Sequence, residues 1–227
     1  MTAELILVLV FIGGIVFLVY RADKSGKKKI VFFGDSLTEH ATLNKGYITL
    51  MKKMLEQLGI INFELLCAGI IGNKIYDLYL RMEEDVLSKS PHIVVVFIGV
   101  NDVWQKKTHH TGTDIDKFEI FYRAIIIKLK INAVKVVLCT PALIGEKKDG
   151  LNEQDEELNN YCNIIRNLAA ELELPLVDIR NACIEYEEAN NTGNIEKGLL
   201  TIDGVHLNSK GNQLVAELMW DVIKEVK

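Results

Sequence analysis

The feature that most limits the possible folds of this chain is the repeated alternation of short apolar runs with longer helical patterns. The apolar runs are rich in Val, Ile and Leu and show no polar alternation, which is typical of strands covered on both faces. They occupy residues 29–33, 63–67, 92–98, 134–139 and 174–178. We therefore predict a five-stranded parallel sheet.

Helical patterns lie between these strands and after the last of them. They span residues 46–58, 75–88, 116–130, 153–172, 184–189 and 210–226. Strands that alternate with helices of these lengths form a three-layer α/β/α sandwich with right-handed crossovers. Such folds bind ligands at the carboxyl ends of the strands, so we expect functional side chains there. A chain of 227 residues, 49% of them apolar, suffices for one such domain.

An uncharged apolar run at residues 5–20 precedes the first strand. Its length is at the short end of what spans a bilayer, and we predict an uncleaved transmembrane helix. The chain is then divided into a membrane anchor (residues 1–21), a polar linker (residues 22–28) and one globular domain (residues 29–227). A cleaved signal peptide or a dimerising apolar helix remains an alternative.

The distribution of charged residues predicts on which side of the membrane the domain lies and argues against a nucleic-acid partner. Basic residues follow the apolar run from Arg21 onward and none precedes it, so the globular domain is predicted on the cytoplasmic side. An exported domain, tethered or secreted, is the alternative. The net charge of −5 is spread along the chain, and the only basic cluster is at residues 27–29, so we predict no nucleic-acid partner. Four cysteines without metal-site spacing are predicted to be buried free thiols: Cys67, Cys139, Cys162 and Cys183.

A candidate nucleophile follows the first predicted strand of the domain. Gly34, Asp35 and Ser36 come directly after residues 29–33. Ser36 would therefore stand at the carboxyl end of a strand, where such folds bind ligands. The alternative is that Asp35 and Ser36 only cap a turn, which is the commoner role of these residue types.

A second polar group follows the strand predicted at residues 92–98. Residues 99–102 read GVND, which places the Asn101 amide at another carboxyl end. There it could donate a hydrogen bond to an oxyanion. Asn followed by Asp is also ordinary turn chemistry, so this block alone does not decide between the two roles.

Asp203 and His206 lie three residues apart just before the last predicted helix. Gly204 permits a tight turn between them, so both side chains can point inward. The imidazole could then accept the Ser36 proton while the carboxylate orients it. A helix-capping loop is the alternative. The other histidines have no evident partner and are interpreted as ordinary polar residues: His40, His92, His109 and His110.

Taken together, residues 34–37 (GDSL), 99–102 (GVND) and 203–206 (DGVH) resemble the hallmark blocks of the SGNH/GDSL hydrolase family. The resemblance covers about residues 29–226. It implies a flavodoxin-like fold and a serine-dependent ester hydrolase, with Ser36 as nucleophile, His206 as base and Asp203 as its partner.

The family's remaining block is matched more loosely by residues 67–73 (CAGIIGN), where Gly72 aligns with the oxyanion glycine better than Gly69 does. The resemblance implies an oxyanion hole formed by the Ser36 and Gly72 amides and the Asn101 side chain. Cys67 stands where the family often has Asn, which puts one supporting hydrogen bond in doubt. The implied reaction is acyl transfer to water, without a metal or other cofactor.

The sequence does not identify the ester. The loops expected at the carboxyl face are residues 103–114, 142–152 and 190–201, and their composition names no substrate. Short loops on a compact domain favour a small acyl ester, although the family also includes enzymes that act on lipids. An acyltransferase on the same fold and a catalytically silent ligand-binding protein are the alternative functions.

Overall fold

The computed structural model describes residues 10–11, 14–15 and 26–226. A parallel sheet at its centre has the strand order β4-β3-β5-β6-β7. These strands are β3 (Lys28–Gly34), β4 (Phe63–Gly69), β5 (Ile93–Phe97), β6 (Lys135–Cys139) and β7 (Leu176–Val177). The predicted five-stranded parallel sheet is confirmed, and its order is that of flavodoxin-like folds.

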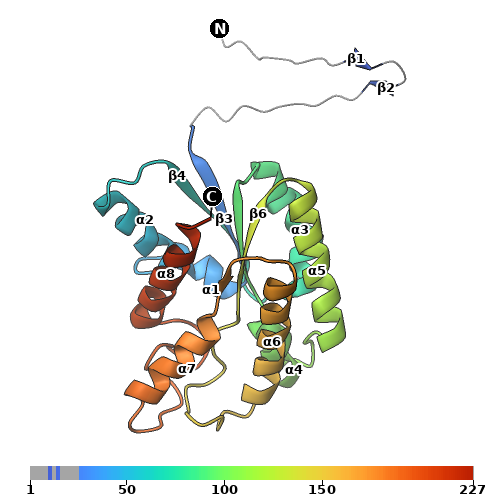
Figure 1. The fold of residues 1–227 in the computed structure, drawn as a ribbon. Coiled ribbons are helices and arrows are strands. Elements are labelled where there is room, and N and C mark those ends of the chain that lie inside the picture. The colour runs from blue at the N-terminus through green and yellow to red at the C-terminus, as the bar shows by residue number, and fades with distance from the viewer. Residues whose placement is uncertain (1–9, 12–13, 16–25, 227) are drawn as a thin grey trace.

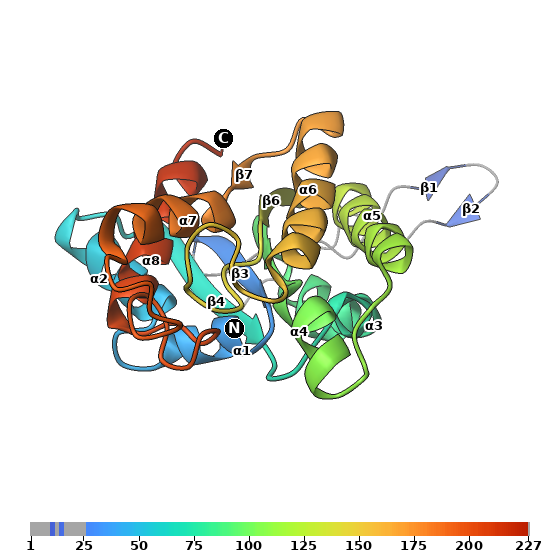
Figure 2. The same cartoon turned by 90° about the horizontal axis from the view of Figure 1, so that it is seen from below.

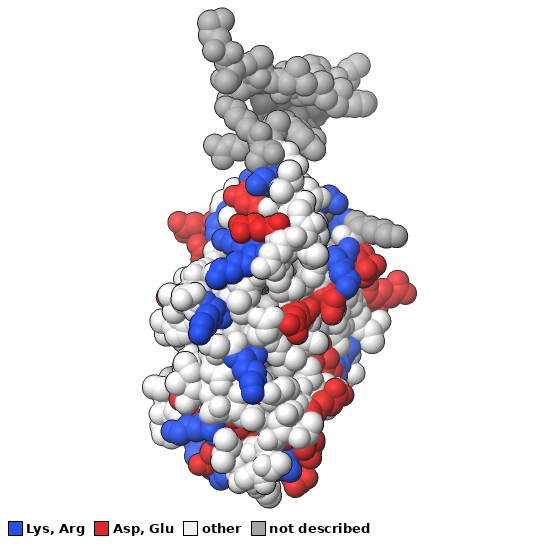
Figure 3. Space-filling view, turned by 90° about the vertical axis from the view of Figure 1, so that its left-hand side faces the viewer, with Lys and Arg blue, Asp and Glu red and all other residues white. Residues whose placement is uncertain are grey.

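Helices cover both faces of the sheet, which makes the predicted three layers (Figure 1). The layer on the left of the view contains α2, α7 and α8, and the opposite layer contains α3, α5 and α6. Their bounds are α2 (Tyr47–Gln57), α3 (Ile75–Asp85), α5 (Ile115–Ile131), α6 (Asp155–Glu171), α7 (Ile179–Asn190) and α8 (Ser209–Ile223). On the outer surface of the α2 and α8 layer, charges of both signs are interspersed, as expected for a face in contact with solvent (Figure 3).

The core lies between the sheet and these layers. Every residue of β5 is buried, and Ile30–Phe33 of β3 are inaccessible to solvent. Burying one such side chain is worth about 1.5–3 kcal/mol. Two covered faces therefore explain why these strands read as continuous apolar runs.

Two helices differ from the sequence analysis. Residues 103–108, predicted to be loop, belong to helix α4 (Val100–Thr108), because Val100 and Val103 are buried and anchor an otherwise polar segment. Helix α7 begins at Ile179, five residues before the predicted start at residue 184, and its buried face includes the charged Arg180 and Glu187. A helix is recognised in a sequence by its apolar periodicity, and charged residues on the buried face of α7 weaken that pattern.

Most of the predicted membrane helix at residues 5–20 lies outside the described residues. The described part consists of β1 (Val10–Phe11) and β2 (Gly14–Ile15), which pair antiparallel where a helix was predicted. Glycine and β-branched residues have low helix propensity in water, which is consistent with this difference. Among the described residues, no helix is both long and apolar enough to cross a membrane.

The carboxyl ends of the strands meet at one edge of the molecule. Figure 2 looks onto this edge, where α4 and the short helix α1 (Ser36–Glu39) lie with the loops that follow β6 and α7. The three sequence blocks that carry the candidate residues converge here.

Candidate active site

Ser36 begins helix α1, and only Asp35 separates it from the end of the interior strand β3. A side chain on Gly34 would place its Cβ 2.2 Å from the carbonyl oxygen of Phe97 and 2.3 Å from Thr38 Oγ1, so only glycine fits. Asp35 caps the helix, because its Oδ1 accepts a hydrogen bond from the Leu37 N–H at 2.9 Å. The capping role considered for Asp35 is therefore present, and it fixes the turn on which Ser36 stands.

The structure brings Ser36, His206 and Asp203 into one hydrogen-bonded row. Ser36 Oγ lies 3.1 Å from His206 Nε2, and His206 Nδ1 lies 2.8 Å from Asp203 Oδ2. Asp203 Oδ1 also accepts hydrogen bonds from the N–H groups of Val205 and His206 at 3.0 and 2.8 Å. Gly204 has a φ of +102°, which permits the tight turn between the two side chains.

Electrostatics keep Asp203 in its ionised form. Partial burial opposes the charge, but the hydrogen bonds from the His206 side chain and from the two backbone N–H groups outweigh it and lower the pKa of Asp203. An ionised carboxylate is the form that can orient an imidazole and stabilise its protonated state.

The candidate oxyanion residues lie at the neighbouring strand ends. Asn101 is on the first turn of α4, only 2% exposed, and its Nδ2 donates to the Asn73 carbonyl at 3.1 Å. The adjacent Gly72 carbonyl accepts a hydrogen bond from Gln105 Nε2 at 3.2 Å. Asn101 and the Gly72 turn are thus side by side. Gly34 pairs in register with Gly69 of β4, so this turn follows the strand next to that of Ser36.

Cys67, which stands where the family often has Asn, makes hydrogen bonds of its own in this region. Its Sγ donates to the Thr38 carbonyl at 3.3 Å and accepts from the Gly69 N–H at 3.4 Å. The thiol therefore makes two polar contacts at a position where the family often has an amide. Cys67 is partly buried and the other three cysteines are buried, all as free thiols.

Two further carboxyl groups are buried beside the site. Burial raises the pKa of Asp35 to about 7 and that of Asp102 to about 6. Asp102 accepts from the Ile75 N–H at 3.1 Å, which ties α4 to the start of α3. Within the described part of the chain, no group of three or more His, Cys, Asp or Glu residues is arranged to hold a metal ion.

Comparison with known proteins identifies the family of this chain. Residues 32–214 match the GDSL-like Lipase/Acylhydrolase family. The chain belongs to this family. It is a carboxylic ester hydrolase.

Two of the relatives of this hydrolase are named acetyl xylan esterases, and a third is a lipoprotein. A crystal structure of an acetyl xylan esterase is 55% identical, covers 86% of this chain and 99% of its own, and superposes with a TM-score of 0.85. A curated acetylxylan esterase of Geobacillus stearothermophilus is 29% identical over 83% of this chain and 90% of its own length. An uncharacterized lipoprotein of Bacillus subtilis is 25% identical over 91% of this chain and 94% of its own length.

Two hollows of the hydrolase border the Asp203–His206 pair. The smaller, of about 200 Å³, is lined by residues of α1, of the loop after it and of the start of α8, including His40 and His206. The larger, of about 610 Å³, reaches from Trp104 to Asp203 and Lys147. The Trp104 ring stands edge-on to His206 with the centroids 6.2 Å apart. Polar side chains make up most of the lining of the larger hollow.

Among the residues that the sequence analysis did not single out, Arg81 of α3 has the most contacts with the site backbone. Its Nη2 donates to the carbonyls of Gly34 and Ala68 at 2.8 and 2.9 Å, and its Nε donates to Asn73 Oδ1 at 2.7 Å. Arg81 thereby joins the ends of β3 and β4 to the turn that carries Gly72. In the sequence it stands four residues before Asp85, which resembles an ordinary ion pair on a helix surface.

The other histidines differ in their relation to the site. The ring of His40 lies 5.6 Å from that of His206 between centroids and is tilted by 45° to it, so His40 lies at the site, where the sequence analysis did not place it. His92 accepts from the Lys29 N–H at the opposite end of the sheet, and His109 contacts Thr108 in an exposed loop. These two have the ordinary polar roles that were expected.

Proposed function

We propose that this enzyme hydrolyses small acyl esters through an acyl-serine intermediate, with Ser36 as nucleophile, His206 as general base and Asp203 as the partner of His206. The observation that carries the proposal is the row of contacts from Ser36 Oγ to His206 Nε2 at 3.1 Å and from His206 Nδ1 to Asp203 Oδ2 at 2.8 Å. A hydroxyl is activated when an adjacent base accepts its proton and a third group orients that base.

The proposed reaction has two halves. In the first, Ser36 Oγ attacks the ester carbonyl, its proton passes to His206 Nε2, and the protonated imidazole returns that proton to the departing alkoxide. In the second, His206 accepts a proton from water, whose oxygen attacks the acyl-serine. The protonated imidazole then gives that proton to Ser36 Oγ as the bond to the acyl group breaks, which releases the acid and restores the Ser36 hydroxyl. Asp203 stays ionised throughout, in keeping with its lowered pKa.

In each half of the reaction the carbonyl oxygen becomes an oxyanion, and we assign its stabilisation to three hydrogen-bond donors at the ends of three strands. These are the N–H of Ser36, the N–H of Gly72 and Nδ2 of Asn101. Gly72 is favoured over Gly69 because the Gly69 N–H already donates to Cys67 Sγ. The contact between Asn101 Nδ2 and the Asn73 carbonyl supports the assignment, since it holds the amide beside the Gly72 turn.

For the substrate, we infer an acetyl ester of a carbohydrate. The solved protein that is 55% identical over nearly its whole length is named an acetyl xylan esterase. The mostly polar lining of the 610 Å³ hollow beside Asp203 suits sugar hydroxyls better than a long alkyl chain. The ring of Trp104 at its edge offers the apolar face on which sugars commonly pack.

The test compares acetate release from acetylated xylooligosaccharides with hydrolysis of nitrophenyl acetate and nitrophenyl octanoate. We expect the oligosaccharide to have the highest kcat/KM and the octanoate the lowest, and His206→Ala to abolish all three activities. A preference for octanoate would overturn the carbohydrate assignment but leave the mechanism intact. Products that carry the acyl group on an added alcohol in preference to water would show an acyltransferase.

We further propose that residues 5–20 attach the enzyme to a membrane with the catalytic domain on the cytoplasmic side. The support is the uncharged apolar run followed by basic residues from Arg21 onward. In that location the substrate would be a soluble oligosaccharide and not a polymer outside the cell. A reporter fused to the C-terminus and active only when exported tests the orientation. Reporter activity would place the domain outside, as the name of the lipoprotein relative suggests for that protein.

A further inference from the structure

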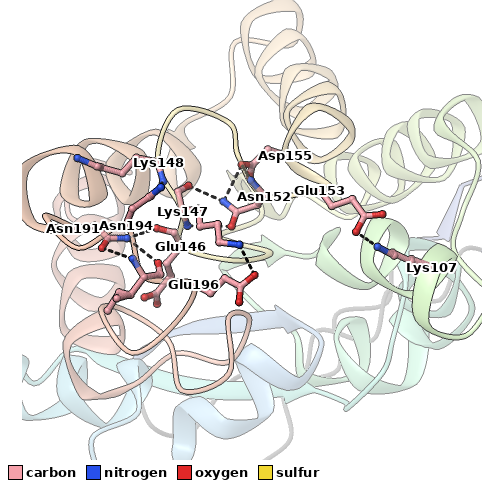
Figure 4. A network of polar contacts seen from close by, with 11 residues as sticks. Lys107, Glu146, Lys147, Lys148, Asn152, Glu153, Asp155, Asn191, Asn194 and Glu196 are labelled. Atoms are coloured by element: carbon pink, nitrogen blue, oxygen red, sulfur yellow. Dashed lines mark hydrogen bonds and ion pairs between the residues drawn. The ribbon is translucent and has the colours of Figure 1, made fainter.

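A buried glutamate lies behind the loop that carries Asp203 and His206. Glu146 is in the loop after β6 and is 0% exposed. Its carboxylate accepts hydrogen bonds from the N–H groups of Leu199 and Leu200 at 2.6 and 2.9 Å and from both the N–H and the hydroxyl of Thr201. Among the described residues, no ion pair includes Glu146. The carboxylate is therefore stabilised by N–H and hydroxyl donors of residues 199–201. Figure 4 shows Glu146 within the neighbouring polar network, beside Lys147 and Asn191.

The contacts continue from Glu146 to the turn between Asp203 and His206. The Thr201 hydroxyl donates to Glu146 and accepts from the Gly204 N–H at 2.9 Å. The Gly204 carbonyl in turn accepts from the Gly145 N–H at 2.7 Å. The Gly204 N–H is thus linked to Glu146 through the Thr201 hydroxyl, and the Gly204 carbonyl is bound directly by Gly145, the residue before Glu146.

No other regular structure holds this turn. The described chain has no helix or paired strand between Asn190 and Ser209 apart from one isolated bridge, Thr201 to Leu207. The Asp203 side chain is 48% exposed, so burial does not fix it. Leu200, Val205 and Leu207 pack this loop into the core, so the hydrogen bonds at the turn set the position of the exposed Asp203 carboxyl within a loop that is itself anchored.

We propose that Glu146 is a positioning residue for the Asp203–His206 pair, acting through the backbone of residues 199–201 and the Thr201 hydroxyl. The inference rests on the proposed function, because it gives Glu146 a role in catalysis only if His206 is the base. Glu146 itself touches neither Ser36 nor the imidazole in the contacts described.

The chemistry of the site requires a carboxylate at this position. Oε1 accepts three hydrogen bonds and Oε2 accepts one, so both oxygens face donors. An amide of the same shape would turn its NH₂ group toward at least one backbone N–H, leaving two donors face to face in a buried place. Glu146→Gln is therefore a nearly isosteric change that breaks the contacts, whereas Glu146→Asp keeps the charge but withdraws it by one methylene.

The test measures kcat and KM for nitrophenyl acetate per reactive site, with sites counted by fluorophosphonate labelling of Ser36. We expect Glu146→Gln to lower kcat on the order of 10- to 100-fold, as supporting residues commonly do, with KM changed less than about twofold. Glu146→Asp should recover part of the loss. The matched control is Glu187→Gln, because Glu187 is also buried, at 3% exposed, and has an Oε1 without a hydrogen-bond partner. Its kcat should equal that of the wild type.

A spectroscopic readout separates positioning from a merely structural role. The proton between His206 Nδ1 and Asp203 should give a downfield imidazole resonance in the wild type and in Glu187→Gln, and this resonance should broaden or vanish in Glu146→Gln with circular dichroism unchanged. A variant that melts at a lower temperature but keeps wild-type kcat per labelled site would overturn the proposal.

If Glu146→Gln does not fold, Thr201→Val tests the positioning role of Glu146 in its place. It removes only the hydroxyl that joins Glu146 to the Gly204 N–H, and we expect a smaller fall in kcat with the same change in the imidazole resonance. Wild-type kcat in Thr201→Val would contradict the proposal. The failure of the proposed function would be distinct, since Ser36→Ala would then retain activity whatever the Glu146 variants do.

Discussion

The two halves of the candidate site are built in different ways. Ser36 follows a seven-residue strand at the interior of the sheet, where backbone pairing on both sides and buried neighbours fix its position. His206 and Asp203 stand in a loop whose hydrogen bonds to the rest of the domain include four to one buried carboxylate, that of Glu146. The comparison shows that regular structure positions Ser36, the proposed nucleophile, while side-chain contacts between distant segments position His206, its proposed base.

Changes to the two halves should therefore have different consequences. Substitutions at the reacting groups remove chemistry and leave the fold intact, whereas substitutions at the supports alter stability or geometry first. The experiments below separate these cases, beginning with the largest effect.

Loss of either reacting group should be the most severe change. We expect Ser36→Ala and His206→Ala each to lower kcat by about 10⁴-fold or more, because residues of a triad act as a unit. Melting temperatures should stay near that of the wild type. Steady-state hydrolysis of nitrophenyl acetate measures the effect, and a loss below tenfold in either variant would remove that residue from the mechanism.

Loss of Asn101 should be the next largest effect. Asn101→Ala removes one donor from a shared oxyanion hole, so kcat should fall on the order of 10²–10³-fold with a small change in KM. The control is Asn163→Ala, since Asn163 is an exposed residue of α6 that contacts Arg166. Equal kcat values in the two variants would exclude Asn101 from the oxyanion hole.

Loss of Arg81 should affect stability more than chemistry. Arg81→Ala removes the side-chain donor to the carbonyls of Gly34 and Ala68, of which Gly34 keeps a hydrogen bond from the Ile70 N–H, and we expect the free energy of unfolding to fall by about 2–4 kcal/mol. Arg123→Ala is the matched control, because Arg123 pairs with Glu119 and Glu171 on the surface and should contribute about 1 kcal/mol or less. Urea denaturation measures both, and equal losses would contradict the role given to Arg81.

The last effect concerns pH and is small within any one pH unit. Burial raises the pKa of Glu187 to about 8, so between about pH 4.5 and 8 the native state holds a proton that the unfolded chain has released. The free energy of unfolding should therefore fall as pH rises through this window, by at most about 1.4 kcal/mol per pH unit for this group. Asp35, whose pKa is raised to about 7, contributes in the same direction up to that pH.

Glu187→Gln cannot titrate and should flatten this dependence. Urea denaturation at pH 5, 6.5 and 8 gives the comparison. A wild type whose stability rises over this range, or a variant with the same slope as the wild type, would show that Glu187 is not protonated in the folded state.

The sequence predicts the strands of the sheet better than the side-chain contacts that support the site, for a physical reason. A strand covered on both faces, such as Ile93–Phe97, produces an apolar run that can be recognised without its partners. The short blocks that contain Ser36 and His206 were singled out because their residue types suit the proposed chemistry. Their supports were missed, since Arg81 and Glu146 act on backbone atoms, and Glu146 meets residues more than fifty positions away in the chain.

Local patterns also explain where the element predictions were wrong. The polar residues of α4 resembled a loop, yet packing of Val100 and Val103 makes them helical. The early turns of α7 carry Arg180, whose Nη2 pairs with the buried Asp155 at 2.6 Å. A single sequence does not show whether a charged residue such as Arg180 lies on the surface or in a buried ion pair. The start of α7 was therefore predicted five residues too late.

The most direct test of the central claim is the intact mass of the protein after treatment with a fluorophosphonate. The account requires one adduct on the wild-type enzyme, located on the peptide that contains Ser36, with loss of ester hydrolysis in proportion to labelling. Ser36→Ala should remain unlabelled and inactive. Labelling at another residue, or an unlabelled and folded wild type that still hydrolyses esters, would contradict the assignment of Ser36 as the nucleophile.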